Sequence, residues 1–495
     1  MASRLRKVSR SRFYAAPPRA GLASLLVTAA CLAGAGETRA QAISNEDLLL
    51  RGITDDGGLS DTERRRLLRA ADRIVEDPVG EERLPAQPVI VEPIEPVQSA
   101  DTVNPPTAPV AVQENRRDDP DPFEPVGIRV GTFILRPSVT QQIAHEHQND
   151  GTATVSRTYS RTVLDTEIES DWSRHQLVIG AEQVIDKTIS GDGSEDPQTS
   201  VNADLRLDIS STTTADLSFD YQFGREDQTD ANAVTNAIAQ AEVHSFGASA
   251  ALTHLFGSWR GTASIDGGRT TFGSAELSSG SLVSLSDRNE NNYTVTLRAG
   301  LETGSAYRPF VEGDFGQIIY DDALDSSGFA RSSKTYGLRA GVATDFGEKL
   351  TGEVSVGYAQ RDIDDSRLEP IQAFTVDGFA TWSPRRGTNV LMGLSTSLED
   401  STTADESGSV YYAATAEVTH RLRTNLQANA SGFIGWRDYV GTTPNQIVAG
   451  AGAGMTWWLN RYFAIDGGVT YERRFNDGGT EEDDLFVGVG MKVQR

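Results

Sequence analysis

Residues 201–223, VNADLRLDISSTTTADLSFDYQF, decide the fold class of this chain. Apolar residues occupy alternate positions in two runs, which are separated by a short polar stretch around Ser211 and Thr212. The positions between the apolar residues hold Asn, Asp, Arg, Ser and Gln. In an extended strand, successive side chains point to opposite faces, so each run has one apolar and one polar face. The stretch therefore predicts two strands joined by a tight turn.

The same alternation recurs from Gly127 to Arg495, clearly so in 293–301, 336–342, 354–358, 428–436 and 463–471. Each run has about ten residues, and such a strand crosses a bilayer when it is tilted near 45°. A bilayer requires every backbone N–H and C=O to be paired, so strands cross it only as a closed barrel. The predicted fold is all-β: a closed antiparallel transmembrane barrel of about eighteen strands (sixteen to eighteen).

The connections between these runs alternate between short and long. Short turns are expected at 172–173, 211–212, 257–258, 304–305, 347–348, 384–385, 422–423 and 460–461. Long, polar, mostly acidic loops are expected at 149–155, 191–198, 225–242, 273–291, 321–333, 362–370, 400–408, 440–446 and 476–484. Tight periplasmic turns and longer outer loops are typical of outer-membrane barrels. A soluble sandwich has no reason to sort its loops by length onto one end.

Aromatic residues gather near the short turns and predict an inner aromatic girdle: Trp172, Trp259, Trp382, Trp457, Trp458 and Tyr462. Tryptophan prefers the headgroup layer of a membrane. The alternative is that these aromatics end strands over a soluble core. That alternative does not explain why they gather at one end.

Charged residues at the polar strand positions are predicted to line a water-filled interior. The basic candidates are Arg206, Arg298, Arg339, Arg361, Arg437 and Arg473. The acidic candidates are Asp204, Asp208, Asp216, Asp220, Glu312, Asp314 and Glu353, with Glu182, Glu417, Asp466 and Glu472. Their acidic excess predicts a mild preference for cations. Two alternatives stay open: the charges only brace the wall, or loops 225–242 or 273–291 fold inward and plug the lumen.

Three segments are expected before the barrel, which should occupy 127–495. Residues 1–40 read as a cleaved signal peptide, with a basic start, an apolar stretch at Gly21–Gly36 and small residues at the cleavage site. A membrane anchor, or lipidation at Cys31, is the alternative. Residues 41–77 form a periplasmic segment with an amphipathic helix, and Ser60 and Glu63 supply its capping box. Residues 78–126 form a Pro-rich acidic linker.

The composition limits the partners of the chain. Its formal net charge is −25 and its mean hydropathy is −0.37, so it is too polar for a helical membrane protein. Such acidity argues against nucleic acid, whose phosphates it would repel. The expected partners are outer-membrane lipid, lipopolysaccharide and the barrel assembly machinery. Whether the protein forms a homo-oligomer stays open.

The segment Gly127–Ser138, GIRVGTFILRPS, resembles the start of a family of proteobacterial outer-membrane proteins, the putative β-barrel porins. Those proteins also place an acidic, Pro-rich stretch ahead of the barrel. The resemblance covers 127–495 and implies a porin-like barrel in the outer membrane of a Gram-negative cell. It supplies no catalytic residues. The last strand, 485–493, ends in Gln494 and Arg495 rather than in the terminal aromatic residue usual for outer-membrane barrels.

Other chemistry is weakly supported. His145 and His147 could share a metal ion, but no third ligand accompanies them, so solvated rim histidines are expected instead. The glycine-rich run 450–454 lies in a strand with no following helix and is not a phosphate loop. None of the six histidines stands in a recognisable nucleophile context. No cofactor, metal site or enzyme activity is therefore predicted.

The leading functional prediction is a porin-like barrel for passive diffusion of small hydrophilic solutes. One alternative is a structural or surface-interaction barrel, whose acidic outer loops meet divalent cations, polysaccharide or host surfaces. Another is an export conduit for polysaccharide, with the Pro-rich arm docking periplasmic partners.

Overall fold

The computed structural model describes residues 123–495, except 150–153, 192–194, 196, 227–231, 233, 235–236, 278 and 477–480. The expected signal peptide (1–40) and the expected helical segment (41–77) lie outside the described residues. So does the Pro-rich linker (78–126), apart from its last residues, Phe123–Val126.

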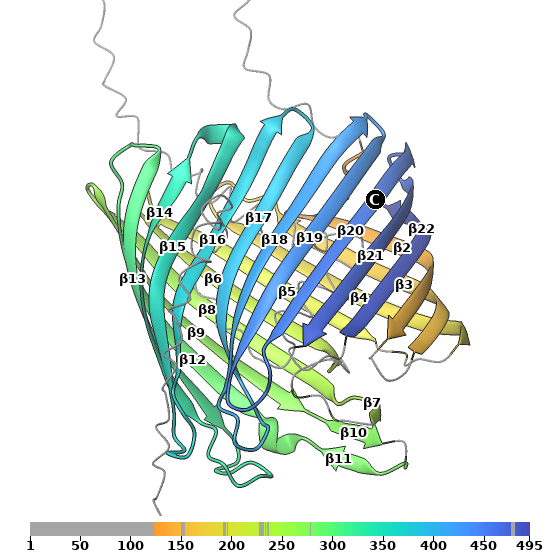
Figure 1. The fold of residues 1–495 in the computed structure, drawn as a ribbon. Coiled ribbons are helices and arrows are strands. Elements are labelled where there is room, and N and C mark those ends of the chain that lie inside the picture. Colours follow the sequence, from red (N-terminus) through yellow and green to blue (C-terminus); the bar gives the residue numbers. More distant parts are fainter. Residues whose placement is uncertain are drawn as a thin grey trace, which may run out of the picture.

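The protein forms a closed antiparallel barrel of 18 long strands, which confirms the predicted fold class (Figure 1). In chain order the strands are β2 (Phe133–Asn149), β3 (Thr154–Ser170), β4 (Gln176–Gly191), β5 (Gln198–Ser210), β6 (Thr213–Arg225), β8 (Glu242–Phe256), β9 (Trp259–Phe272), β12 (Glu290–Leu301), β13 (Tyr307–Tyr320), β14 (Ser333–Asp345), β15 (Leu350–Ile363), β16 (Ile371–Arg385), β17 (Thr388–Asp400), β18 (Gly408–Arg423), β19 (Leu426–Val440), β20 (Gln446–Asn460), β21 (Phe463–Asn476) and β22 (Glu481–Gln494). Each pairs with the next, and β2 pairs with β22 from Ser138↔Gln494 to Asn149↔Asp483, which closes the barrel. A short strand, β1 (Ile128–Val130), folds back on the start of β2.

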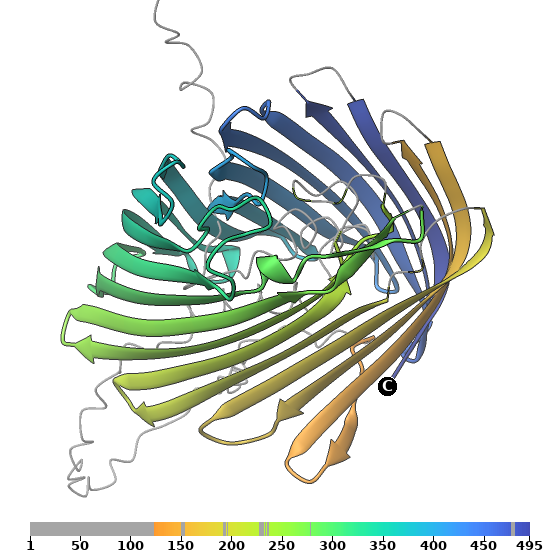
Figure 2. The same ribbon diagram turned by 90° about the horizontal axis from the view of Figure 1, so that it is seen from below.

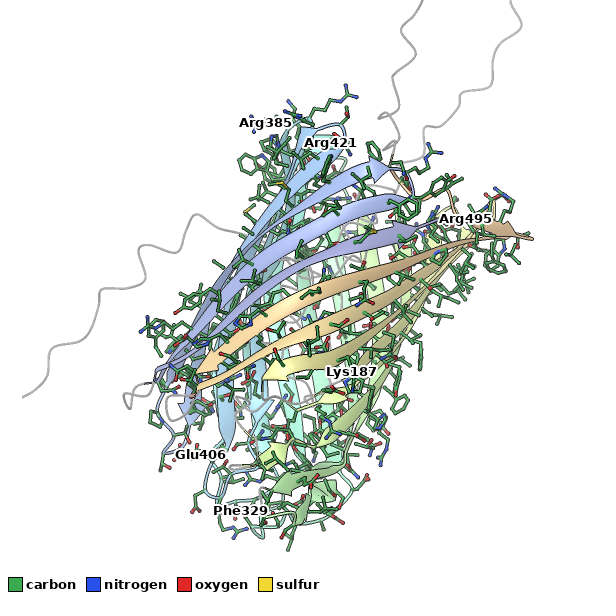
Figure 3. The ribbon with its side chains drawn as sticks, turned by 90° about the vertical axis from the view of Figure 1, so that its right-hand side faces the viewer. Lys187, Phe329, Arg385, Glu406, Arg421 and Arg495 are labelled. Carbon is green, nitrogen blue, oxygen red and sulfur yellow. The ribbon has the colours of Figure 1, made fainter. Side chains whose placement is uncertain are left out.

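Short turns and long loops occupy opposite ends of the barrel, as the sequence predicts. Figure 3 shows Arg385, Arg421 and Arg495 at the short-turn end and Phe329 and Glu406 at the other. Three turns lie later than expected, because 384–385 belong to β16, 422–423 belong to β18 and 460 belongs to β20. The turn after β16 is then residues 386–387, where glycine supplies a φ of 74° that other residues rarely adopt.

The strands are longer than the sequence predicts. They range from 12 residues in β12 to 17 in β2 and β3. About ten residues suffice to cross the hydrocarbon layer, so the additional residues extend the wall beyond it. The sequence does not predict this extension, because the residues at the strand ends are polar and are typical of loops.

The apolar residues of the barrel lie mainly on its outer surface. Leu217, Phe219 and Ile265 are exposed there, whereas the interior buries polar groups such as Glu353 and Asp377. Buried apolar clusters are small, and one of them joins Ala144 and Tyr159 with a phenylalanine of β22. This distribution inverts that of a soluble protein and suits a wall between lipid and water.

Two consecutive long loops form a small three-stranded sheet. It consists of β7 (Ala237–Ala239), β10 (Ser274–Leu277) and β11 (Leu282–Ser284), with β10 in the middle. Seen from the long-loop end, these strands lie within the outline of the barrel mouth (Figure 2). The 3-10 turns η1 (Ser286–Arg288) and η2 (Gly347–Lys349) are short. Over the described ranges, no helix is long and apolar enough to cross a membrane.

One seam of the barrel is incomplete. The ladder between β16 and β17 runs from Arg385↔Thr388 to Gly378↔Leu394 and stops there. Beyond that point, β16 keeps its pairing with β15, and β17 keeps its pairing with β18. The residues 371–377 of β16 and 395–400 of β17 are called the lapped seam below.

Candidate pore: the barrel interior and the segment across its mouth

Alternation along each strand places the charged candidates relative to the lumen. On β12 to β16, Arg298, Glu312, Asp314, Arg339 and Glu353 share the face opposite to the exposed apolar residues. Directly paired residues lie on the same face of a sheet. The residues that pair with an inward-facing residue on the neighbouring strand therefore also face the lumen.

These residues form one network across β12 to β16. The guanidinium group of Arg298 donates two hydrogen bonds to Glu353, at 2.6 and 3.1 Å, and approaches Glu312 at 3.5 Å. Arg339 donates to Glu312 at 2.7 Å and to Asp377 at 3.4 Å. Arg298 also lies over the Phe310 ring, 3.5 Å from its centroid. Two guanidinium groups are therefore held by several carboxylates in a rigid, net acidic belt.

Arg361 and Arg437 extend the charged lining toward the long-loop end. Arg361 donates to Asp400 at 2.7 Å. Arg437 is 2% exposed and donates to Glu399 at 2.8 Å and to Gln446 at 2.7 Å. Its guanidinium group also faces the Tyr411 ring at 5.0 Å. The burial and these contacts make Arg437 the most enclosed charge among the candidates.

The wall formed by β5, β6, β8 and β9 is predominantly acidic. Its inward positions carry Asp204, Asp208, Asp216, Asp220 and Asp266. Its basic residues facing inward are Arg206, which donates to Asp208 at 3.1 Å, and Arg260, which pairs with Glu302 near the short turns. This wall and the belt of β12 to β16 therefore give the lumen an acidic bias.

Two inward carboxylates lie flat against the wall because glycine stands opposite them. Asp220 pairs with Gly247, and Asp314 pairs with Gly337. A Cβ atom at either glycine would collide with the carboxylate oxygens. Such a glycine opposite an aspartate keeps the charge at the wall and leaves the interior space free.

Several interior charges were missed in the sequence. Arg161 binds Asp186 through two hydrogen bonds of 2.9 Å, and Arg157 donates to Glu146 at 2.7 Å. The alternation along β2 to β4 places these residues on the polar face, so the sequence pattern could have identified them as interior charges. The interior position of Arg473 was predicted wrongly: it shares its face with exposed Tyr471 and lies over the Phe475 ring. Its neighbour on the inward face is Arg474, which pairs with Glu472 at 3.0 Å.

Asn232, in the loop between β6 and β8, makes hydrogen bonds to residues at and just after the end of β17. Its side chain accepts hydrogen bonds from the backbone N–H and the hydroxyl of Thr402, at 3.1 and 3.2 Å. It also donates to the backbone oxygen of Asp400 at 3.4 Å. Because β6 and β17 lie on opposite walls (Figure 1), these hydrogen bonds join two sides of the barrel mouth. The hydrogen bond from Arg288 to Glu226 ties the base of the loop between β6 and β8 to the next loop.

Three other outer loops are joined to one another by hydrogen bonds. Arg331 donates to Asp325 at 2.7 Å and to the backbone oxygens of Glu406 and Thr403. The Glu406 carboxylate accepts from the backbone and hydroxyl groups of Thr442 and Thr443. These contacts join loops 321–332, 401–407 and 441–445 into one rim.

This clasp of hydrogen bonds lowers the pKa of two carboxyl groups in these loops. Burial alone would raise the pKa of Asp325, but hydrogen bonds from the Phe329 backbone and from Arg331 outweigh it and hold the pKa below its usual value. For Glu406, burial acts in the same upward direction, and the threonine hydrogen bonds again lower the pKa overall. Both side chains therefore remain charged at neutral pH.

The predicted aromatic girdle is divided between the two faces. Trp172, Trp259, Trp382, Trp457 and Tyr462 are exposed on the outer surface near the short turns. Trp458 is the exception, because it follows Trp457 in an extended strand and therefore points inward. It stacks on Phe123, with ring centroids 6.1 Å apart. The assignment of Trp458 to the girdle is thus wrong.

The histidines make isolated hydrogen bonds. His145 and His147 face outward on β2 and lie within hydrogen-bonding distance of the hydroxyls of Thr158 and Ser156. Throughout the part of the chain that the structure describes, no group of three or more His, Cys, Asp or Glu residues could hold a metal ion.

The closed wall, the apolar outer surface and the charged interior define a class of protein: a hollow β-barrel of the porin type. More particularly, the sequence profile described as "Putative beta-barrel porin 2" matches residues 121–495, so the chain belongs to this family.

Similar solved structures include the copper transporter OprC, with a TM-score of 0.41 and 9% identity over 75% of this chain and 81% of that chain. The outer membrane protein opdK from Pseudomonas aeruginosa has a TM-score of 0.38 and 11% identity over 73% of this chain and 99% of that chain. OccAB4 from Acinetobacter baumannii has a TM-score of 0.37 and 9% identity over 76% of this chain and 100% of that chain. No curated protein sequence matches the chain.

Proposed function

We propose that the barrel is a channel in the outer membrane of a Gram-negative cell and that small hydrophilic solutes diffuse through it passively. The observation that supports this most strongly is the charged lining of the interior on several walls, from Arg161 and Asp186 to Arg298 and Glu353. Facing rows of opposite charge order the water between them. An apolar solute would have to displace that water without replacing its hydrogen bonds.

The acidic bias of the lumen supports a preference for cations. The aspartates of β5 and β6 face the belt of β12 to β16, in which carboxylates outnumber guanidinium groups. Rings of Asp and Glu attract cations in pores.

Reversal potentials in planar bilayers with a salt gradient test this proposal. The refolded wild-type channel should favour the cation. The triple variant Asp204→Asn/Asp216→Asn/Asp220→Asn should shift the potential toward that of an unselective pore. A matched control, Asp322→Asn/Asp364→Asn/Glu369→Gln, removes the same charge from exposed positions in the outer loops and should shift it less. An anion-selective wild type, or equal shifts in both variants, would contradict the assigned lining.

The partners of the barrel follow from its surface. The apolar outer band and the exposed aromatics near the short turns suit contact with membrane lipid, and the polar outer loops suit contact with lipopolysaccharide. Insertion of such a barrel requires the assembly machinery. Association into a homo-oligomer would show as native-mass species in detergent.

The rim formed by Arg331 and Glu406 favours a second candidate, a structural or surface-interaction barrel. A clasped rim presents a fixed surface rather than a free passage. Folded protein that gives no channel openings would favour this second function. For the export alternative, deletion of residues 43–125 is informative, because a simple pore should still conduct without them.

A further inference from the structure

The lapped seam joins strands that overlap rather than pair edge to edge. Residues at odd positions of β16 face inward, as Asp377 shows by its contact with Arg339 in the lumen. On β17, Leu398 faces outward, because its position has the same parity as Val390, which pairs with exposed Trp382. Contact between these two sets would require the inner side of β16 to meet the outer side of β17.

That contact is present. Ile371 and Ala373 of β16 form a buried cluster with Val410 of β18, and Leu398 and Tyr412 pack against it. The inward face of β16 therefore covers the outward face of β17 and β18. The outer end of β16 lies outside its neighbours, and an apolar layer fills the space between them.

Side chains replace the missing ladder across the overlap. The Thr396 hydroxyl accepts from the Val376 backbone N–H at 2.9 Å and donates to the Val376 oxygen at 3.0 Å. Asp377 accepts from the Thr396 backbone N–H at 2.9 Å. The Tyr412 hydroxyl donates to the Phe374 oxygen at 3.0 Å. An unpaired backbone group facing lipid costs several kcal/mol, so these contacts are what permits the interruption.

The overlap faces the lipid on one side and the lumen on the other. On the outer surface of β16, Phe374 is 77% exposed and Val376 is also exposed. On the inner side, Asp377 and Arg339 belong to the charged belt. Between them, Ile371 is 0% and Val410 is 4% exposed. The packed layer between lipid and lumen is thus apolar for most of its depth and charged at its inner end.

We propose that the lapped seam is a lateral port that admits the alkyl chain of a single-chain amphiphile between the lumen and the outer membrane. An alkyl chain that enters the overlap leaves the apolar lipid and contacts the apolar side chains of β16 and β18. Its entry breaks no backbone hydrogen bonds between β16 and β17, because these two strands are not paired there. The polar head stays among the charged groups of the belt. This adds a route for amphiphiles to the proposed channel for hydrophilic solutes, and it does not depend on that channel conducting.

Photolabelling tests the port on the refolded wild-type protein in liposomes. The probe is dodecanoate with a diazirine on its chain, and labelled positions are read by mass spectrometry. Lipid-facing residues such as Phe374 should be labelled in any case. The port predicts additional labelling of buried Ile371, Ala373 and Val410, which an excess of unlabelled dodecanoate suppresses. Labels confined to lipid-facing positions would overturn the proposal.

A bridged variant provides the second arm. With Cys31, the single cysteine of the chain, changed to Ser, Ile371→Cys/Val410→Cys is bridged by a short bifunctional methanethiosulfonate, which forms one disulfide with each cysteine and releases two methanesulfinate ions. The bridge should abolish labelling of Ala373, and reduction should restore it. A control bridge, Val342→Cys/Val354→Cys, joins directly paired residues of β14 and β15 and should leave labelling unchanged. Persistent labelling of Ala373 under the first bridge would overturn the port, whereas conductance reports separately on the channel.

Discussion

Replacing Arg437 by Met should destabilise the barrel by about 3 kcal/mol. The guanidinium group is almost fully buried and holds Glu399 at 2.8 Å and Gln446 at 2.7 Å. Removing one partner of a buried ion pair costs about 3–5 kcal/mol, because the other charge is left without compensation. The Glu399 side chain is 15% exposed and can be reached by lumen water, which places the expected loss at the lower end.

The assay is urea unfolding of the refolded protein in detergent, followed by tryptophan fluorescence. The matched control is Arg129→Met, which breaks the pair with Asp171, whose side chains are 62% and 52% exposed. Exposed pairs contribute at most about 1 kcal/mol, so this control should stay near the wild type. The double variant Arg437→Met/Glu399→Leu should recover most of the loss. Equal stability of Arg437→Met and Arg129→Met would refute the assignment of a buried interior charge.

Three further predictions follow from the mouth and the girdle. Asn232→Ala removes the hydrogen bonds that join two sides of the mouth and should raise single-channel conductance; unchanged conductance would show that these hydrogen bonds do not restrict flow. Asp325 and Glu406 have lowered pKa values, so their contribution to the loop clasp is complete above the ordinary carboxyl pKa of about 4 and is lost as pH falls through the lower folded values. Limited proteolysis should therefore find the loops resistant at pH 5 and cleaved only in stronger acid; cleavage already at pH 5 would contradict this. In variants that keep a single tryptophan, brominated lipid should quench Trp382 strongly and Trp458 weakly, whereas equal quenching would place both in the lipid.

The alternation in β5 and β6 was sufficient to predict the barrel, because lipid outside and water inside impose opposite requirements on adjacent residues. The same parity identified the inward position of Arg298 and Glu312. The prediction failed where the type of residue, rather than its position in the alternation, decided the face. Arg473 was assigned to the inward face because it is charged, although Arg474 is the arginine that faces inward. Trp458 was assigned to the outer girdle together with Trp457 for the same reason, because both are tryptophans near a short turn.

Other features depend on contacts between segments far apart in the chain. Asn232 accepts hydrogen bonds from Thr402 and donates one to the Asp400 backbone oxygen on the opposite wall, and nothing in the local sequence specifies that pairing. The lapped seam is equally hidden, because nothing in residues 371–377 and 395–400 marks where the pairing between the two strands ends. Only the register shows that their ladder stops.

Thiol modification during single-channel recording tests the central claim most directly. Asp204 and Leu205 are neighbours on β5, and the Asp204 side chain faces the lumen whereas the Leu205 side chain faces the lipid. In a background without Cys31, a cationic methanethiosulfonate reagent should reduce the current of Asp204→Cys in discrete steps and leave Leu205→Cys unaffected. Block of Leu205→Cys with none at Asp204→Cys, or a folded protein that never opens, would contradict it.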